Sequence, residues 1–298
     1  MADKGRLKIQ CFVGDTYEPV EGSRAILVPS QGNSGGNLGG NNQVNLVTNS
    51  SGESQIIELD APPLAYSQQP SQPTPYSLYD LRIETEGFQT LLINGIQIFP
   101  GQTAIQQCQL IRSDNRKSSR ADVIDISPNT LNGNYPAKIP EEIDKPLPPP
   151  TSGVVLPKPE VPEFITVHTG SPNNDSAPNY KVLYKDYIKN VASCEIYSTW
   201  PENTIRANVY AIISFTLNRI YTEWYRGKGK NYDITNSTAY DHAFTYGRNI
   251  YDSISAVVDD IFSSYIRRVG RKQPLLTQYC DGKNVQCPGW MTQWGSKY

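Results

Sequence analysis

The chain has 298 residues and a formal net charge of −2, from 27 Lys plus Arg against 29 Asp plus Glu, a balance that gives no electrostatic reason to expect nucleic acid or an anionic membrane as a partner. The first residues, MADKGRLKIQCFVGD, lack the apolar run of a secretory signal peptide, and no stretch approaches the ~20 apolar residues that span a bilayer. We therefore expect a soluble protein without a secretory signal peptide.

The first 110 residues consist of short runs in which apolar and polar residues alternate. Examples are LKIQCFV, RAILV and QTLLINGIQIF, separated by clusters of Gly, Asn, Ser and Pro. Runs at this spacing are typical of an all-β sandwich, which we predict over residues 1–112. Cys11 and Cys108 fall on the first and last predicted strands, where we expect two buried thiols without a chemical role.

Residues 113–163 have the composition of an exposed linker. The run at 111–122 is basic and polar, and the run at 141–164 is thick with proline. Such segments tend to be extended and open to proteolysis, so we predict processing sites within 111–122 or 145–157. The linker would lead into a second domain at 164–298.

That second domain shows helical spacing. A first helix is predicted through YKDYIKNVASC to end at or near Glu195, and a third over 247–266. The long second helix is predicted to begin near residue 200, where Thr199 and Glu202 have capping-box spacing and Pro201 fits the first turn. Its expected buried face comprises Ile205, Val209, Ile212, Leu217, Ile220 and Trp224. Residues 164–298 are therefore predicted to be mainly helical, with a few short strands.

Glu195 is the first candidate for chemistry. It follows Cys194 and precedes Tyr197 and Trp200, so its carboxyl should be partly desolvated. Desolvation raises the pKa of a carboxyl group toward that of a general acid. A solvated or capping glutamate would give the same pattern, so spacing alone does not decide between these roles.

Two separated motifs resemble the stage II sporulation protein D family. They are YKDYIKNVASCEIYSTWPENTIRANVYAI, which contains Glu195, and GWMTQWGSKY near the end of the chain. The whole chain is similar to the spore cortex-lytic enzymes that carry this domain. The resemblance implies a multidomain fold, in which a transthyretin-like β-sandwich pro-domain precedes a mainly α (α+β) catalytic domain. It also implies that a C-terminal peptidoglycan-binding domain, usual in such enzymes, is absent from this chain.

The resemblance also implies an activity. Enzymes of this kind are spore-localised zymogens that subtilisin-like germination proteases activate, and they degrade cortex peptidoglycan as lytic transglycosylases without a cofactor. The family's single acid/base glutamate corresponds to Glu195. The sugar's own C6 hydroxyl is the nucleophile, so the second carboxylate of ordinary glycosidases is not required.

Other family positions transfer less directly. Arg206 stands at the family's basic position, and Thr292 and Gln293 match its Ser-Gln pair. We expect these three residues to bind substrate. Tyr279 and Trp294 could line the groove, although ordinary packing explains these aromatics equally well. Tyr240 and Asp241 correspond to the family's loop over the cleft, which makes Tyr240 a further candidate for substrate binding. The family's helix arginine falls on Ile213 or Ser214, and Arg219 is a possible substitute.

Alternative chemistries have weaker support. Cys280 and Cys287 form a C-x₆-C pair, but the chain has only two histidines, so we expect no metal and either a disulfide or two thiols. A Cys194 nucleophile would need His242 close by. An N-acetylmuramoyl-L-alanine amidase and a non-catalytic peptidoglycan-binding or assembly protein stay open as alternatives.

Overall fold

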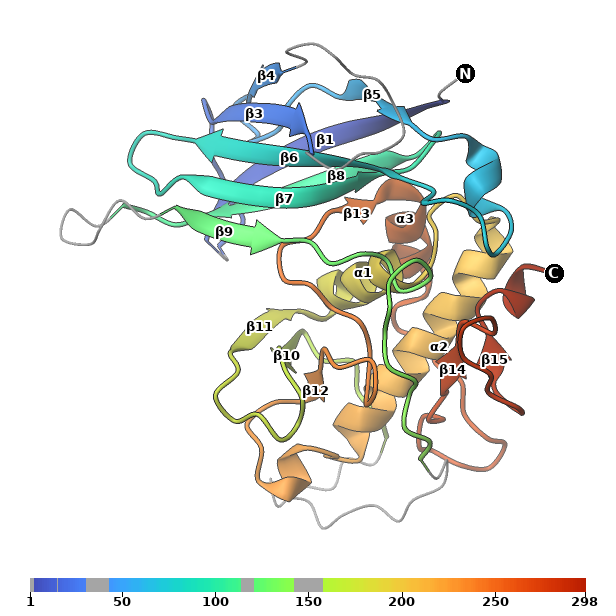
Figure 1. Cartoon of the computed structure of the whole chain (residues 1–298). Coiled ribbons are helices and arrows are strands. Elements are labelled where there is room, and N and C mark those ends of the chain that lie inside the picture. The colour runs from blue at the N-terminus through green and yellow to red at the C-terminus, as the bar shows by residue number, and fades with distance from the viewer. Residues whose placement is uncertain (1–2, 15, 31–42, 114–120, 142–157) are drawn as a thin grey trace. The chain divides into compact units, whose positions relative to one another are not determined.

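The computed structural model describes residues 3–14, 16–30, 43–113, 121–141 and 158–298 (Figure 1). The chain divides into two compact units. Unit 1 comprises Met1–Ser127 and Tyr246–Ser253, and unit 2 comprises Pro128–Thr245 and Ile254–Tyr298. The expected division into a pro-domain, a linker and a catalytic domain stays a prediction, and most of the expected processing runs lies outside the described residues.

Unit 1 is built from two five-stranded sheets. One sheet has the order β13 (Ile250–Tyr251), β8 (Thr103–Leu110), β1 (Asp3–Val13) and β2 (Glu18–Pro19), with β5 (Ile57–Ala61) also paired to β1. The other has the order β4 (Val44–Val47), β3 (Arg24–Pro29), β6 (Ser77–Glu84), β7 (Leu91–Ile98) and β9 (Asp122–Asp125). A 3₁₀ turn, η1 (Leu64–Ser67), lies between β5 and β6.

Alternation along the strands explains the core of unit 1. On β1, Leu7, Ile9 and Cys11 are fully buried, while the residues between them retain exposure, as the two-residue period of a strand requires. β1 and β8 run parallel, with Cys11 opposite Cys108. Both cysteines are buried and free, so the expectation of two buried thiols is confirmed.

A short segment from late in the chain completes unit 1. β13 pairs antiparallel with β8. The Asn249 side chain and the Gln97 backbone exchange two hydrogen bonds of 3.2 Å. Arg248 Nη2 donates to Gln97 Oε1 at 2.9 Å, and the Tyr251 hydroxyl donates to the Gln97 carbonyl at 3.0 Å. Buried polar groups need such partners, so this network ties residues 248–251 to β7 as well as to β8.

Unit 2 combines two small sheets with helices. Its strands are β10 (Phe164–His168), β11 (Asn179–Leu183) and β12 (Ile234–Thr235), in the order β11-β10-β12, and the parallel pair β14 (Tyr279–Cys280) and β15 (Met291–Thr292). Its helices are α1 (Tyr184–Glu195), α2 (Glu202–Tyr221) and most of α3 (Asp252–Ile261), with the 3₁₀ turns η2 (Arg226–Lys228) and η3 (Gly295–Lys297). α1 and α2 pack together. Ile205, Val209, Ile212 and Leu217 are buried on α2 as predicted, whereas Ile220 is only partly buried and Trp224 lies beyond the end of the helix.

The predicted cap of the second helix and the predicted start of the third are wrong. The second helix starts near residue 200 as expected, at Glu202, but its N-cap is Pro201 without a side-chain cap hydrogen bond, so the expected capping box does not form. The third helix was expected from residue 247 but starts at Asp252, because residues 248–251 are used by the sheet and polar network of unit 1.

The expected fold class is also wrong. The chain is about 30% strand and 20% helix, so it is mainly β rather than a sandwich joined to a mainly helical domain. The helical periodicity was read correctly in α1 and α2, but short strands and loops occupy much of the remaining chain. Of the helices that the structure describes, none has the length and apolarity needed to cross a bilayer.

Candidate functional site

Glu195 is the last residue of α1, as the sequence predicted. The Ile196 N–H closes the final turn on Ala192, and Ile196 itself is extended, which ends the helix. The backbone carbonyl of Glu195 accepts hydrogen bonds from Gln293 Nε2 at 2.9 Å and from Thr130 Oγ1 at 3.4 Å. Both bonds fix the main chain from which the carboxyl group projects.

The Glu195 carboxyl is buried, with the residue only 4% exposed. Oε1 accepts from the Ala243 N–H at 2.6 Å, and Oε2 accepts from the Tyr279 hydroxyl. Burial raises the pKa of this carboxyl above its ordinary value; the charge of Lys138 and these two donors oppose the rise only in part. Desolvation therefore dominates, and it favours the protonated form.

Tyr279 and His242 line one side of this carboxyl. Burial and the negative charge of Glu195 hold the pKa of Tyr279 well above its usual range. The hydroxyl therefore keeps its proton and donates a hydrogen bond to Glu195. The His242 ring stacks on Tyr279 at a centroid distance of 5.9 Å, and its Nδ1 lies 3.2 Å from the Tyr187 hydroxyl. Burial holds the pKa of His242 well below its usual range, so the imidazole is neutral at physiological pH.

Lys138 contributes the nearby positive charge. Its Nζ donates to the Asp241 carbonyl at 2.6 Å and lies 4.5 Å from the Phe215 ring centroid and 4.9 Å from that of Tyr279. Burial of the ammonium lowers the pKa of Lys138 to about 8, although the charges of Glu195 and Asp241 favour protonation. Aromatic faces and a carbonyl thus hold a cation close to the Glu195 site.

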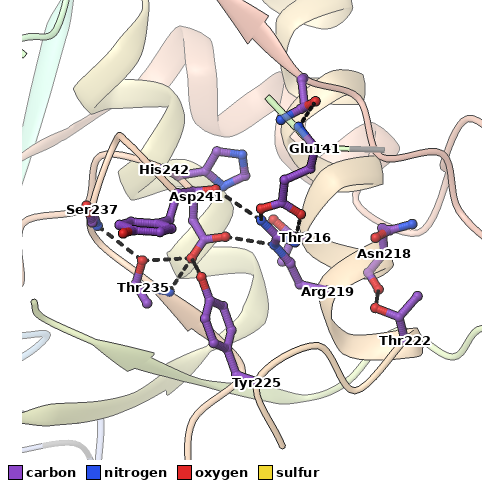
Figure 2. A network of polar contacts seen from close by, with 12 residues as sticks. Glu141, Thr216, Asn218, Arg219, Thr222, Tyr225, Thr235, Ser237, Asp241 and His242 are labelled. Atoms are coloured by element: carbon purple, nitrogen blue, oxygen red, sulfur yellow. Dashed lines mark hydrogen bonds and ion pairs between the residues drawn. The ribbon is translucent and has the colours of Figure 1, made fainter. Parts of the chain in front are cut away.

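A second buried network positions the loop that carries Ala243 (Figure 2). Arg219, which is 1% exposed, donates from Nε to Asp241 at 2.8 Å and binds Glu141 through two bonds of 2.9 and 2.8 Å. The other Asp241 oxygen accepts from the Tyr225 hydroxyl at 2.6 Å and from Thr235 N and Oγ1 at 2.9 and 2.7 Å. Asp241 lies two residues before Ala243, so these bonds also fix the N–H that reaches Glu195.

The structure brings two of the other predicted site residues to Glu195. Tyr279 bonds its carboxyl and Gln293 bonds its carbonyl, both from buried positions. Sequence reasoning expected both as substrate contacts, whereas here they hold Glu195 itself.

The other predicted substrate contacts make their described bonds elsewhere. Arg206 pairs with Glu202 at 2.9 Å and with Asp260 at 2.5 Å. Thr292 Oγ1 accepts from the Gly295 N–H at 3.1 Å, and the Tyr240 carbonyl accepts from Arg219 at 3.0 Å. The guanidinium of Arg219 is engaged by Glu141 and Asp241, which leaves it unsuited to replace the family's helix arginine as a substrate contact.

The structure also decides between the alternatives for Trp294 and for the Cys280 and Cys287 pair. Trp294 is 6% exposed and packs against Trp200 and Tyr197, at centroid distances of 5.0 and 5.8 Å, so packing accounts for it. Cys280 and Cys287 are joined by a disulfide, which closes the loop between them. Within the described ranges, no group of three or more His, Cys, Asp or Glu side chains could hold a metal ion.

The described bonds of Cys194 and His242, the proposed partners in the rival cysteine mechanism, go to other residues. Its Sγ donates to Asn190 Oδ1 at 3.5 Å, while His242 Nδ1 bonds Tyr187. His242 Nε2 has no hydrogen-bond partner among the described residues.

Sequence reasoning missed Lys138 and the Ala243 N–H, and it placed Asp241 in a loop over the cleft without foreseeing its bonds to Arg219, Tyr225 and Thr235. Lys138 lies in a stretch interpreted as linker, and a backbone N–H carries no side-chain signal at all. The run YPAKIPEE places a lysine and two acids among prolines. These charged residues were the one sequence signal that this stretch makes polar contacts with the folded chain.

The site contains one carboxyl group, that of Glu195, which can release and rebind a proton. Its pKa is raised, its main chain is fixed, and both oxygens have neutral donors. A group of this kind suits general acid–base chemistry.

No protein-family model and no curated protein matches the chain. Among solved structures, the Bacillus anthracis TIE protein is 16% identical over 37% of this chain and 17% of that one, with a TM-score of 0.24. Catechol 1,2-dioxygenase from Pseudomonas arvilla is 12% identical over 41% and 58%, with a TM-score of 0.27. 3-Chlorocatechol 1,2-dioxygenase from Rhodococcus opacus is 9% identical over 38% and 61%, with a TM-score of 0.25. The chain spans less than two thirds of each of these chains, and at such TM-scores the likeness supports no inference about function.

Proposed function

We propose that this chain is a spore cortex-lytic enzyme of the SleC type, a lytic transglycosylase that cleaves the bond between muramic acid, or its δ-lactam, and N-acetylglucosamine. The observation that carries the proposal is the Glu195 carboxyl: it is 4% exposed, its pKa is raised by burial, and two neutral donors orient it. The two sequence motifs supply the substrate class by resemblance.

In the proposed reaction, Glu195 first acts as an acid. It protonates the glycosidic oxygen as the bond from that oxygen to C1 breaks. The carboxylate then accepts the proton of the C6 hydroxyl while that oxygen bonds to C1, which gives a 1,6-anhydro end and returns the carboxyl to its starting form. No water is consumed, and an internal nucleophile gains an effective molarity that can reach roughly 10⁵ M or more.

A single carboxyl group suffices for this chemistry, which agrees with the site. The acids Asp241 and Glu141 are engaged by Arg219. Within the described residues, no other carboxylate shares a hydrogen-bond donor with Glu195. A two-carboxylate glycosidase would need a second acid across the scissile bond.

We further propose that the chain is made as a zymogen and acts in the spore. Support comes from the resemblance and from the runs at 111–122 and 145–157, whose polar or proline-rich composition suits cleavage by subtilisin-like germination proteases. Burial of Glu195 in the uncut chain is in keeping with a latent form.

The test is digestion of purified cortex sacculi by the protease-processed protein, with the released fragments analysed by mass spectrometry. We expect muropeptides ending in 1,6-anhydro sugars, and a rate that falls by about 10²–10⁴-fold in Glu195→Gln. Glu202→Gln is the matched control, since Glu202 is exposed at the start of α2.

Three outcomes would contradict the proposal. Undiminished release by Glu195→Gln would remove the carboxyl from the reaction. Release of peptides without anhydro sugars would indicate an amidase, and binding without release would indicate a non-catalytic protein.

A further inference from the structure

Residues 128–141, which we call the strap, were expected to be linker but pack onto unit 2 beside Glu195. At its start, Asn129 Nδ2 donates to the carbonyls of Ser193 and Ile196 at 3.3 and 3.1 Å, and the Thr130 N–H donates to the Cys194 carbonyl at 2.9 Å. The beginning of the strap is thus anchored to the chain on both sides of Glu195.

The far end of the strap is anchored by polar contacts as well. The Ile139 N–H donates to the Ala239 carbonyl at 2.7 Å, and Gln278 Nε2 donates to the Ile139 carbonyl at 3.2 Å. The Glu141 carboxylate binds both terminal nitrogens of Arg219. This end leads directly into the expected processing run.

Between the two anchors, the strap delivers Lys138 to the Glu195 site. The ammonium is bound by the Asp241 carbonyl and lies against the Phe215 and Tyr279 rings. Tyr279 is the residue whose hydroxyl donates to the Glu195 carboxyl. Lys138 therefore covers a face of the side chain that orients the proposed acid.

Its charge also acts against the proposed acid. The charged and titratable groups around Glu195 are Tyr279, His242, Tyr187, Cys194, Asp241 and Lys138. Among them Lys138 supplies the positive charge, which stabilises the carboxylate and so lowers the pKa that burial raises. A general acid must carry its proton, and a neighbouring cation opposes that state.

The strap is held in a way that permits displacement. Only Asn129 and Leu131 are buried, and half of the strap is exposed, namely residues 128, 132, 134, 136, 137, 139 and 140. A segment held mainly by polar contacts, with little apolar burial, opens at a lower free energy than the core beneath it.

We propose that Lys138 is an internal cation that keeps Glu195 latent, and that displacement of the strap from unit 2 is the activating step. This inference rests on the proposed function, because it assigns the regulation of the same site.

The test uses the full, uncut chain with Lys138→Gln, with Lys138→Arg as the charge-retaining variant. We expect Lys138→Gln to digest sacculi on the order of tenfold faster than the uncut wild type, and Lys138→Arg to stay latent. Lys185→Gln is the matched control, because Lys185 pairs with Asp259 on the same unit, and it should stay latent too.

A second measurement does not depend on activity. Titration of the Glu195 carboxyl by ¹³C NMR should show a higher pKa in Lys138→Gln than in the wild type, with no change in Lys185→Gln. Glu141→Gln, which weakens the far anchor of the strap, should shift uncut activity upward as Lys138→Gln does.

The outcomes separate the two proposals. An unchanged Glu195 titration in Lys138→Gln, or uncut Lys138→Gln digesting sacculi no faster than the uncut wild type, would overturn the role of Lys138. Activity retained by processed Glu195→Gln would instead overturn the proposed function and leave the titration result standing.

Discussion

Unit 2 buries Asp241 and Glu195 almost equally, at 0% and 4% exposure, but surrounds them differently. Asp241 accepts hydrogen bonds from Arg219, from the Tyr225 hydroxyl and twice from Thr235, so a cation and three neutral donors satisfy it. Glu195 has two neutral donors, and its one nearby cation bonds a backbone carbonyl instead.

The comparison separates a structural acid, Asp241, from the proposed catalytic acid, Glu195. The ion pair and the three neutral donors around Asp241 fix the loop that carries it. A desolvated carboxylate with few donors keeps access to both protonation states. Burial alone therefore does not identify a catalytic acid; the donors around it do.

The largest expected effect on stability follows from removing the charge of Asp241. Asp241→Asn leaves a buried guanidinium with one carboxylate fewer, so the free energy of unfolding should fall by about 3–5 kcal/mol. Denaturant unfolding measures this change. Asp260→Asn is the control, since its carboxylate is 62% exposed and pairs with Arg206; it should cost less than about 1 kcal/mol. Equal losses in the two variants would contradict the contrast drawn here.

A smaller effect on the free energy of unfolding, which depends on pH, is expected for Glu195. Because its pKa is raised in the folded state, its contribution to stability is fully present below the unfolded pKa of about 4.3. That contribution is lost as pH rises through the folded pKa, by up to about 1.4 kcal/mol per pH unit. Denaturant unfolding of wild type and Glu195→Gln between pH 4 and pH 8 should show that the wild type loses stability relative to the variant as pH rises. Parallel curves would mean that Glu195 is not desolvated.

The smallest effect is expected at Arg206. Its guanidinium is 29% exposed and forms surface ion pairs, so Arg206→Gln should change the free energy of unfolding by less than about 1 kcal/mol. The processed variant should digest sacculi at nearly the parental rate. A strong loss of activity without a loss of stability would instead favour the substrate contact expected from the sequence.

Local pattern was informative where a segment buries one face. The apolar periodicity of α2 and the alternation along β1 match the faces that these elements bury. The end of α1 at Glu195 was predicted from the same kind of pattern. The failures arose where long-range contacts override local pattern. The run NIYDSIS has helical spacing, yet its first residues form β13 because Gln97 and β8 provide partners far away in sequence.

The site was predictable only in part, for the same reason. Glu195 carries a side chain that can be weighed from the sequence, and Tyr279 and Gln293 were singled out with it. The Ala243 N–H and Lys138 could not be assigned, because one is backbone and the other depends on a proline-rich stretch folding back onto the site. Composition describes how such a stretch behaves alone, not what it contacts.

The late strand β13 has a consequence for biosynthesis. While the nascent chain emerges from the ribosome, Ala104 and Ile105 of β8 lack their β13 partners until residues 250–251 appear, more than a hundred residues after β8 itself. An unpaired strand edge invites association with other chains. The half-finished sheet should therefore be the stage of translation at which this protein most needs a chaperone.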